Sequence, residues 1–305
     1  MNKRGLAILA AIGATIIYGL NHTIAKGVMP YYVQPFAFIM FRVVGAALLF
    51  WAISFFGPKE KIEKKDYIRM VVCAILGMGV NMLVFFKGLA LSTPINSAVL
   101  ITVTPIIVLI LSALFIKEKI RPQKIFGITI GLLGALGLIL FGNEIREDAP
   151  NIPLGNLFIL MNSFFYGSYL IVAKILIAKY HPFTFMKWLF TLGILICLPF
   201  GFSELTEIQW DNLPFKAVWR IVFVVVGTTF CTYLFNIFAL TQLRASTLSA
   251  FVYVQPLIGI VYAVATGKDS LTAIKIMAAC LVLIGVYLAS KKLPNPRRGK
   301  TYSRS

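Results

Sequence analysis

Asparagine and tyrosine side chains lie inside stretches of this chain that are otherwise apolar. Asn162, Tyr166 and Tyr169 are spaced i, i+4 and i+7, which places them on one face of a helix. Amide and phenol groups donate and accept hydrogen bonds, and aromatic rings offer flat apolar contact surfaces. No nucleophile with an evident His/Asp set and no Cys/His/carboxylate cluster accompanies them. These residue types are suited either to reversible binding of a small solute or to hydrogen bonds between helices, and we expect no enzymatic activity, cofactor or metal.

Other apolar stretches carry similar polar and aromatic faces. Each face either lines a cavity that binds a solute or hydrogen-bonds neighbouring helices together, and the sequence leaves both readings open. The candidate solute-binding residues are Tyr18, Asn81, Phe85, Thr102, Asn162, Tyr166, Tyr169, Thr232, Asn236 and Tyr253.

Two ionisable residues also lie in these stretches. Arg42 stands about eight residues into one of them, where a guanidinium is costly unless it is paired. It is either a structural residue that bonds to helix-end carbonyls or a loop, or an anion-binding or gating residue. His22 is either a hydrogen-bonded structural residue or a proton carrier, because histidine titrates near neutral pH.

Pro105 and Pro256 interrupt two of the stretches near their middle. Proline has no N–H, so the carbonyl four residues before it loses its helical partner. Inside a membrane such a carbonyl needs a neighbouring group or a cavity. Both prolines are therefore gating or structural candidates: they either kink a packed helix or mark a binding site near the membrane midplane.

The composition indicates an integral membrane protein. Hydrophobic residues make up 59% of the 305 residues and charged residues 13%, whereas soluble domains are about 25% charged. Ten stretches are each near the ~20 residues that an apolar bilayer core requires. The expected helices are 5–25, 34–56, 67–89, 95–116, 123–142, 154–176, 183–202, 217–240, 246–266 and 271–290.

The chain repeats its own pattern at an offset of 148 to 151 residues. The matched pairs are Tyr18-Gly19 with Tyr166-Gly167, Ala25-Lys26 with Ala173-Lys174, Pro105 with Pro256, and Gly134 with Gly285. Each copy holds five helices, an odd number, so the second copy must enter the membrane inverted. We therefore expect an all-α integral membrane fold of ten transmembrane helices in two inverted five-helix repeats, an organisation typical of transporters. The expected divisions are a first repeat at 1–142, an external linker at 143–151, a second repeat at 152–290 and a basic cytoplasmic tail at 291–305.

The basic charge indicates an orientation rather than a nucleic-acid partner. The formal net charge is +18, and of the 29 Lys and Arg residues 21 fall on the side of the N-terminus, seven on the other side and Arg42 within a span. Cytoplasmic loops of membrane proteins carry this excess. We expect a multi-pass protein of the cell (inner) membrane with both termini cytoplasmic.

Several motifs are individually loose but ordered and spaced alike in both copies. They are Asn96-Ser97-Ala98, Pro105, Lys117-Glu118 and Gly127 to Gly134 in the first copy, and Ala245-Ser246, Pro256, Lys268-Asp269 and Gly285 in the second. With these motifs the chain resembles the drug/metabolite transporter superfamily, EamA type, over about residues 5–290. Asp269 stands where a glutamate is more usual.

The resemblance implies a ten-helix basket with a central cavity lined by helices one, three, four, six, eight and nine. It implies a secondary transporter that works by alternating access, with export of amino acids or related small metabolites as our first interpretation. The alternatives are an exchanger of nucleotide-sugars or phosphorylated metabolites and, in other classes, a non-transporting scaffold or a lipid-modifying enzyme. The expected partners are a small-molecule substrate and membrane lipid. The Gly127-x-x-x-Gly131 pair predicts close helix packing, either within the monomer or in a homodimer.

The orientation can be tested by cysteine labelling. In a background without the four native cysteines, a membrane-impermeant thiol reagent should label Glu147→Cys in intact cells and Lys61→Cys only after lysis. The reason is the charge asymmetry, which places the 143–151 linker outside and the 57–66 loop inside. Labelling of residue 147 only after lysis would reverse the orientation.

Overall fold

The computed structural model describes residues 3–115, 122–142, 146–243, 251 and 254–290. These residues form helices and connecting turns, with no strand among them. Eight helical segments are long and apolar enough to cross a membrane, and two shorter apolar helices follow them. The chain is therefore a multi-pass membrane protein, as the sequence predicts.

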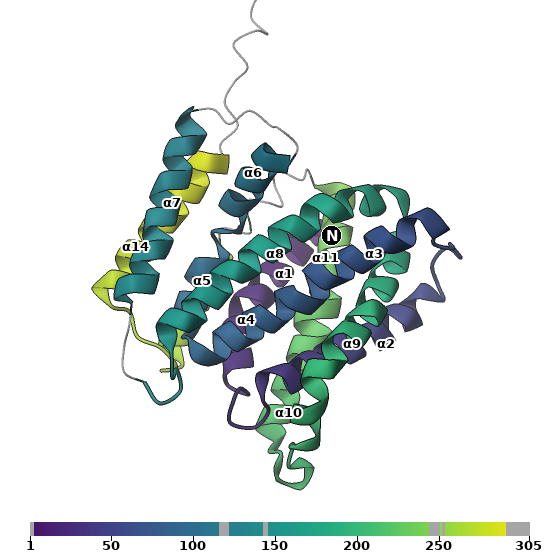
Figure 1. Cartoon of the computed structure of the whole chain (residues 1–305), viewed down its shortest axis with the longest axis horizontal. Helices are drawn as coiled ribbons and strands as arrows, with labels where there is room; N and C mark the ends of the chain where they lie inside the picture. The colour runs from purple at the N-terminus through teal and green to yellow at the C-terminus, as the bar shows by residue number, and fades with distance from the viewer. Residues whose placement is uncertain (1–2, 116–121, 143–145, 244–250, 252–253, 291–305) are drawn as a thin grey trace, which may run out of the picture.

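The helices follow the expected stretches closely (Figure 1). Up to residue 141 they are α1 (Lys3–Lys26), α2 (Pro35–Ser54), η1 (Lys64–Asp66), α3 (Tyr67–Ala74), η2 (Ile75–Gly79), α4 (Val80–Leu91), α5 (Pro94–Ile101), α6 (Thr104–Phe115) and α7 (Pro122–Phe141). After residue 151 they are α8 (Ile152–Lys179), α9 (Pro182–Thr206), η3 (Trp210–Asn212), α10 (Phe215–Val222), η4 (Phe223–Cys231), α11 (Thr232–Gln242), α13 (Gln255–Ala265) and α14 (Ala273–Ser290).

Three of the spans are composite. The expected helices 67–89 and 217–240 each contain a π-helical segment, η2 and η4 respectively, that the sequence reading did not predict. The expected helix 95–116 is interrupted between α5 and α6, as Pro105 led us to expect. α13 begins at Gln255 with Pro256 in its first turn, whereas most of the preceding part of the expected helix 246–266 lies outside the described residues. π-helical segments and broken helices are common at functional sites. The segments η2 and η4 and the break between α5 and α6 are therefore candidate positions for a functional site.

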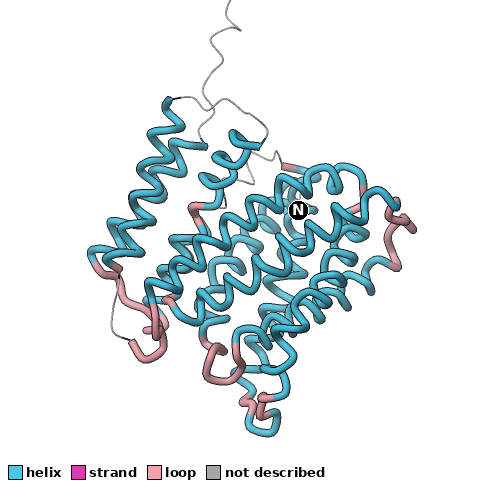
Figure 2. The backbone as a smooth tube through the Cα atoms, viewed as in Figure 1, coloured by secondary structure: helices cyan, strands magenta, loops and turns pink. Residues whose placement is uncertain are grey.

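Helices from before and after residue 150 pack against one another. α7 lies along α14, α2 along α9, α4 along α8, and α1 against α11 and α13 (Figure 1). Short turns join successive helices at the two ends of the bundle (Figure 2). Two related halves would pair in this way, and the inverted repeat itself stays a prediction.

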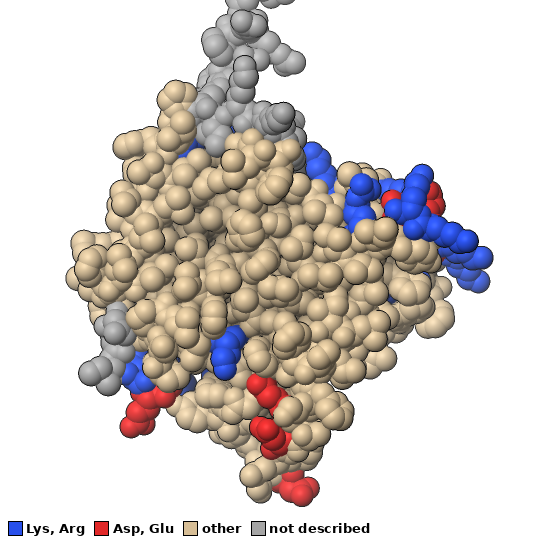
Figure 3. Space-filling view, viewed as in Figure 1, with Lys and Arg blue, Asp and Glu red and all other residues tan. Residues whose placement is uncertain are grey.

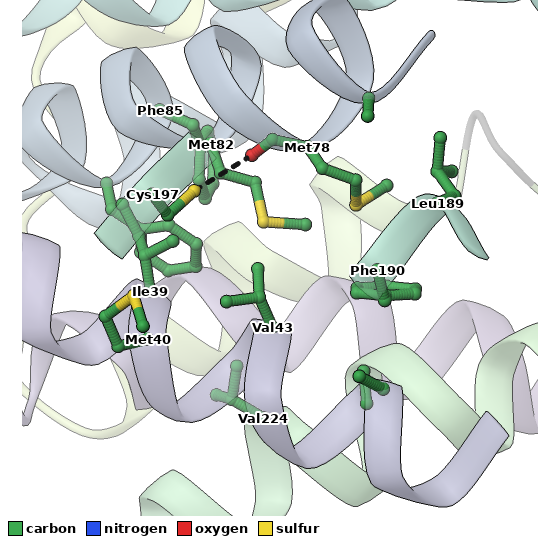
Figure 4. Close-up of a cluster of buried hydrophobic side chains, with 14 of the residues drawn as sticks. Ile39, Met40, Val43, Met78, Met82, Phe85, Leu189, Phe190, Cys197 and Val224 are labelled. Carbon is green, nitrogen blue, oxygen red and sulfur yellow. Dashed lines mark hydrogen bonds between the residues drawn. The ribbon is translucent and has the colours of Figure 1, made fainter. Parts of the chain in front are cut away.

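An apolar core joins α2, α4 and α9 (Figure 4). Val43 of α2 and Phe190 of α9 lie near Met78 and Met82, whose unbranched side chains fill irregular gaps. The Cys197 thiol donates to the Met78 carbonyl at 3.7 Å. Met78 belongs to η2, so this core also holds the π-helical segment in place.

Glycines bring α7 and α14 into direct backbone contact. A Cβ on Gly285 would collide with the backbone of Gly131, and one on Gly127 would lie 2.5 Å from the Ala289 nitrogen. The Gly127-x-x-x-Gly131 pair thus packs within the chain. A homodimer remains an untested expectation.

A valine at residue 285 should separate α7 from α14. We expect Gly285→Val to destabilise the protein by about 1–3 kcal/mol, the usual cost of overpacking, and to lower its unfolding temperature in detergent. Gly137→Val is the matched control, because a Cβ on Gly137 meets nothing within 4 Å. Equal unfolding temperatures for the two variants would contradict this contact.

Candidate functional site

On the inward face of α8, Tyr166 is exposed. Asn162 and Tyr169 share this face and are each 4% exposed, whereas Tyr166 is 40% exposed. The membrane-facing side of α8 is marked by Phe164, which is 46% exposed and lies about 200° around the helix from Tyr166. Tyr166 therefore lies on the inward side of α8, and we infer that its exposed surface borders a space inside the bundle rather than lipid.

Four tyrosines and one arginine from four different spans converge on this space. The rings of Tyr166 and Tyr169 are 5.8 Å apart and tilted by 36°. Tyr18 of α1 lies within electrostatic range of both, of Tyr233 in α11 and of Arg42 in α2. We call Tyr18, Arg42, Tyr166, Tyr169 and Tyr233 the tyrosine–arginine cluster.

Three tyrosine hydroxyls of the cluster are available for hydrogen bonding. Within the described part of the chain the hydroxyls of Tyr18, Tyr169 and Tyr233 have no protein hydrogen-bond partner, and none of them is sealed from solvent. Buried hydroxyls normally find a partner. These phenols can therefore bond to water or to a solute in the interior space.

Helix irregularities position the cluster. The Tyr169 ring packs on Gly77 of η2, where a Cβ would lie 2.6 Å from the ring. Tyr233 is the second residue after η4, and its ring meets that of Phe50 edge to face at 5.3 Å. Both π-helical segments therefore lie next to the cluster: η2 comes from the first half of the chain and η4 from the second half.

Arg42 is held by one edge of its guanidinium. Its Nε donates to the Thr229 hydroxyl at 2.9 Å, and its guanidinium carbon lies 5.5 Å from the centre of the Phe86 ring. Thr229 in turn donates to the Val224 carbonyl, five residues earlier, as the π-helical turn of η4 permits. No acidic side chain pairs with Arg42 anywhere in the described ranges.

The asparagine and histidine candidates join helices. Asn81 of α4 and Asn162 of α8 each donate a side-chain amide to the other's backbone carbonyl, at 3.1 and 3.0 Å. His22 Nδ1 lies 2.9 Å from the Ser97 hydroxyl and so links α1 to α5. Phe85 meets the His22 ring edge-on at 5.8 Å. These side chains fix the walls next to the cluster.

Threonines near the broken helices bond to backbone carbonyls. The Ile101 carbonyl, which Pro105 deprives of its helical donor, accepts from the Thr104 hydroxyl at 2.6 Å. That hydroxyl is also 3.0 Å from the Ser163 hydroxyl of α8. Thr102 and Thr232 likewise donate to the carbonyls four residues before them, at 2.9 and 2.6 Å.

Three members of the cluster, Tyr18, Tyr166 and Tyr169, are among the solute-binding candidates expected from the sequence, and their binding role stays a prediction. Asn236 is half-buried on α11, and Tyr253 lies outside the described residues. Tyr233 was missed, although Thr229, Tyr233 and Asn236 are themselves spaced i, i+4 and i+7.

A network of charges closes one end of the bundle, which we call the linker end because the segment after α7 lies there. Asp269 is buried and pairs with Lys275 at 2.8 Å and Arg146 at 3.1 Å. It also accepts from the Ile95 amide at 2.9 Å, at the start of α5. The observed burial arises because the turn after α13 folds back over α5.

Arg146 also holds Asp148 in this network. Burial alone would raise the pKa of the Asp148 carboxyl. The hydrogen bonds from Arg146 and the attraction of Arg146 and Lys26 outweigh burial and hold this pKa below its usual value. The Lys26 ammonium donates to the Leu89 and Ala90 carbonyls at 3.0 and 2.6 Å, which ties α1 to the end of α4.

A second group of charges lies at the opposite end. Lys179 pairs with Asp66 and Glu63, each at 2.6 Å, and its hydrogen bond lowers the pKa of Glu63. Lys and Arg side chains gather over the start of α3, whereas Asp and Glu side chains stand out near the α9–α10 turn (Figure 3). The charges are therefore distributed unequally between the two ends.

A surface cavity of about 250 Å³ lies apart from the cluster, at the linker end. It is bounded by the turn before α2 and by residues 204–213. Its Glu204 carboxylate already accepts from the Phe36 and Ala37 amides at 2.6 and 3.0 Å. Across the described ranges, no three His, Cys, Asp or Glu side chains group closely enough to hold a metal ion.

Comparison with known proteins gives consistent results over nearly the whole chain. The model of the EamA-like transporter family matches residues 5–140 and again 153–291. The chain is 23% identical to the uncharacterized transporter YyaM of Bacillus subtilis, over 94% of both chains. It is 27% identical to an uncharacterized transporter of Archaeoglobus fulgidus, over 93% of this chain and 98% of that one. A solved crystal structure at 16% identity has a TM-score of 0.60 over 93% of this chain and 97% of that one, which shows a shared fold.

The buried Asp269–Lys275 pair should be important for stability. Lys275→Met should destabilise the protein by about 1–3 kcal/mol, because the buried Asp269 carboxylate loses one charged hydrogen-bond donor and keeps Arg146. Lys268→Met is the matched control, since Lys268 is exposed. Thermal unfolding in detergent measures both. An equal or larger loss for Lys268→Met would contradict the importance of the buried pair.

Proposed function

The chain belongs to the EamA-like transporter family, and from that premise we propose that it is a secondary transporter that exports amino acids or related small metabolites across the cell's inner membrane. The family matches cover both halves of the chain. The relatives named above are transporters without an assigned substrate. The choice of solute and of direction is therefore our proposal.

The tyrosine–arginine cluster carries this proposal. It presents accessible phenol groups and aromatic rings to a space inside the bundle, next to two π-helical segments and one broken helix. Small-molecule sites are typically concave and mostly apolar, with a few convergent polar groups. We assign the solute to this space, with Asn81, Asn162 and Thr102 supporting its walls.

In an alternating-access mechanism the two ends of the bundle open in turn. Helices from the two halves of the sequence pair across the interior, so one half can rock against the other around a fixed site. Charged contacts tie the helices together at the linker end around Asp269 and at the opposite end around Lys179. In our proposal these contacts loosen in turn as each end opens.

The acidic residues suggest how transport is driven. All eleven lie in loops or at helix ends of the sequence, whereas proton and sodium carriers generally place an ionisable group near the midplane. We therefore propose facilitated movement down the solute gradient, or exchange. Counterflow should then persist without a pH or sodium gradient.

Tyr166 offers the direct test. In proteoliposomes loaded with a panel of amino acids and small metabolites, the wild-type protein should show counterflow of at least one solute. Tyr166→Ala should weaken the apparent affinity about tenfold, the effect of losing part of an aromatic contact. Phe164→Ala, two residues away on the membrane-facing side, should leave affinity unchanged.

Two results would contradict the proposal. Absence of counterflow for every solute of the panel would argue for the scaffold alternative. Equal effects of the two substitutions on affinity, with normal folding of both variants, would move the site away from the cluster.

A further inference from the structure

Among the residues that the structure describes, Arg42 is a positive charge inside the membrane that has no acidic partner. All eleven acidic residues of the sequence lie in loops or at helix ends. None of the acids that the structure describes forms an ion pair with Arg42. Intramembrane charges are costly and commonly mark substrate pathways. An anion that visits the site would remove this cost.

The environment of Arg42 leaves its anion-binding edge available. Thr229 accepts from Nε, and the Phe86 ring lies 5.5 Å from the guanidinium carbon. Neither terminal nitrogen has a hydrogen-bond partner among the described residues, and the side chain is only half-buried. A guanidinium fixed in this way can still offer two N–H groups to a carboxylate.

Arg42 also faces the interior space. Val44, on the membrane-facing side of α2, is exposed and lies about 200° around the helix from Arg42. On the opposite side, the Arg42 Nε donates to Thr229 at 2.9 Å, and Thr229 lies one helical turn before Tyr233. Arg42 also lies within electrostatic range of Tyr18. The charge and the aromatic rings therefore border the same space.

We propose, resting on the transport function above, that Arg42 binds the carboxylate of the transported solute and that recognition does not require an α-amino group. The preferred solute is then a monocarboxylate whose apolar body lies against the tyrosine rings.

Charge balance favours this class over two others. A single carboxylate neutralises the single guanidinium. A phosphate monoester carries about −1.5 to −2 charges at neutral pH and would find only one cation in the described cluster. An ammonium group would find no carboxylate there, so a zwitterion leaves one positive charge uncompensated.

Four probes with the same phenyl group separate these features. They are 3-phenylpropionate, phenylalanine, phenethylamine and phenyl phosphate, added to the purified full-length protein in detergent. Binding is measured by the rise in unfolding temperature with ligand concentration. We expect 3-phenylpropionate to bind at least as tightly as phenylalanine, and phenethylamine and phenyl phosphate to bind about tenfold more weakly or not at all.

Substitutions at Arg42 and its support provide the second measurement. Arg42→Gln should weaken binding of 3-phenylpropionate about tenfold or more and leave that of phenethylamine unchanged. Thr229→Val removes the acceptor of the Arg42 Nε and keeps the positive charge. It should cause a smaller loss of affinity for 3-phenylpropionate and leave the affinity for phenethylamine unchanged. If Arg42→Gln fails to fold, Thr229→Val still tests the role of Arg42. Arg69→Gln, which removes an arginine beside Asp66 at the start of α3, is the control and should change neither affinity.

Failure of this inference can be told apart from failure of the transport proposal. Binding of phenethylamine as tight as that of 3-phenylpropionate, tightest binding of phenyl phosphate, or no binding of any probe would overturn it. So would carboxylate binding that Arg42→Gln and Thr229→Val leave intact. If counterflow of panel solutes persists in those cases, the transporter stands and only the carboxylate assignment falls.

Discussion

Inside a membrane every backbone carbonyl needs a donor from the protein or from a cavity, and this requirement governs the structure. Where a helix stays regular, its own ladder meets the requirement. Where the helix breaks before Pro105, the Thr104 hydroxyl supplies the donor for Ile101. In the π-helical segment η4, the Thr229 hydroxyl adds a donor to the Val224 carbonyl. The chain can thus leave the regular helix beside its interior space without exposing unpaired backbone to lipid. Arg42, Tyr169 and Tyr233 of the tyrosine–arginine cluster contact or adjoin the π-helical segments.

The same hydroxyls connect backbone geometry to side-chain placement. Thr229 both closes the π-helical turn of η4 and accepts from Arg42. Thr104 both satisfies the Pro105 break and lies within hydrogen-bond distance of Ser163 on α8. Each irregularity is therefore stabilised by a residue that also bonds to a neighbouring helix. The irregularities serve to orient the walls of the interior.

Much of this could be predicted from the sequence because it depends on period and composition. The length of the apolar stretches predicted the membrane spans, and Pro105 predicted the break between α5 and α6. The i, i+4, i+7 spacing predicted the helix face that carries Tyr166. The π-helical segments could not be predicted, because an extra residue per turn leaves no compositional mark. In 217–240 the sequence reading selected Thr232 and Asn236 and passed over Tyr233, although Thr229, Tyr233 and Asn236 share one helical face. The partners of Asp269 depend on how a turn folds over α5, which no local pattern specifies.

The cluster draws its side chains from separate helices, and this has a consequence for how solute range can change over evolutionary time. Tyr18, Arg42, Tyr166 and Tyr233 stand on α1, α2, α8 and α11, while the glycine contact between α7 and α14 lies elsewhere. A single codon change can reshape one wall of the interior and leave the other walls and the helix contacts intact. Such a scaffold can diversify in small, separately viable steps.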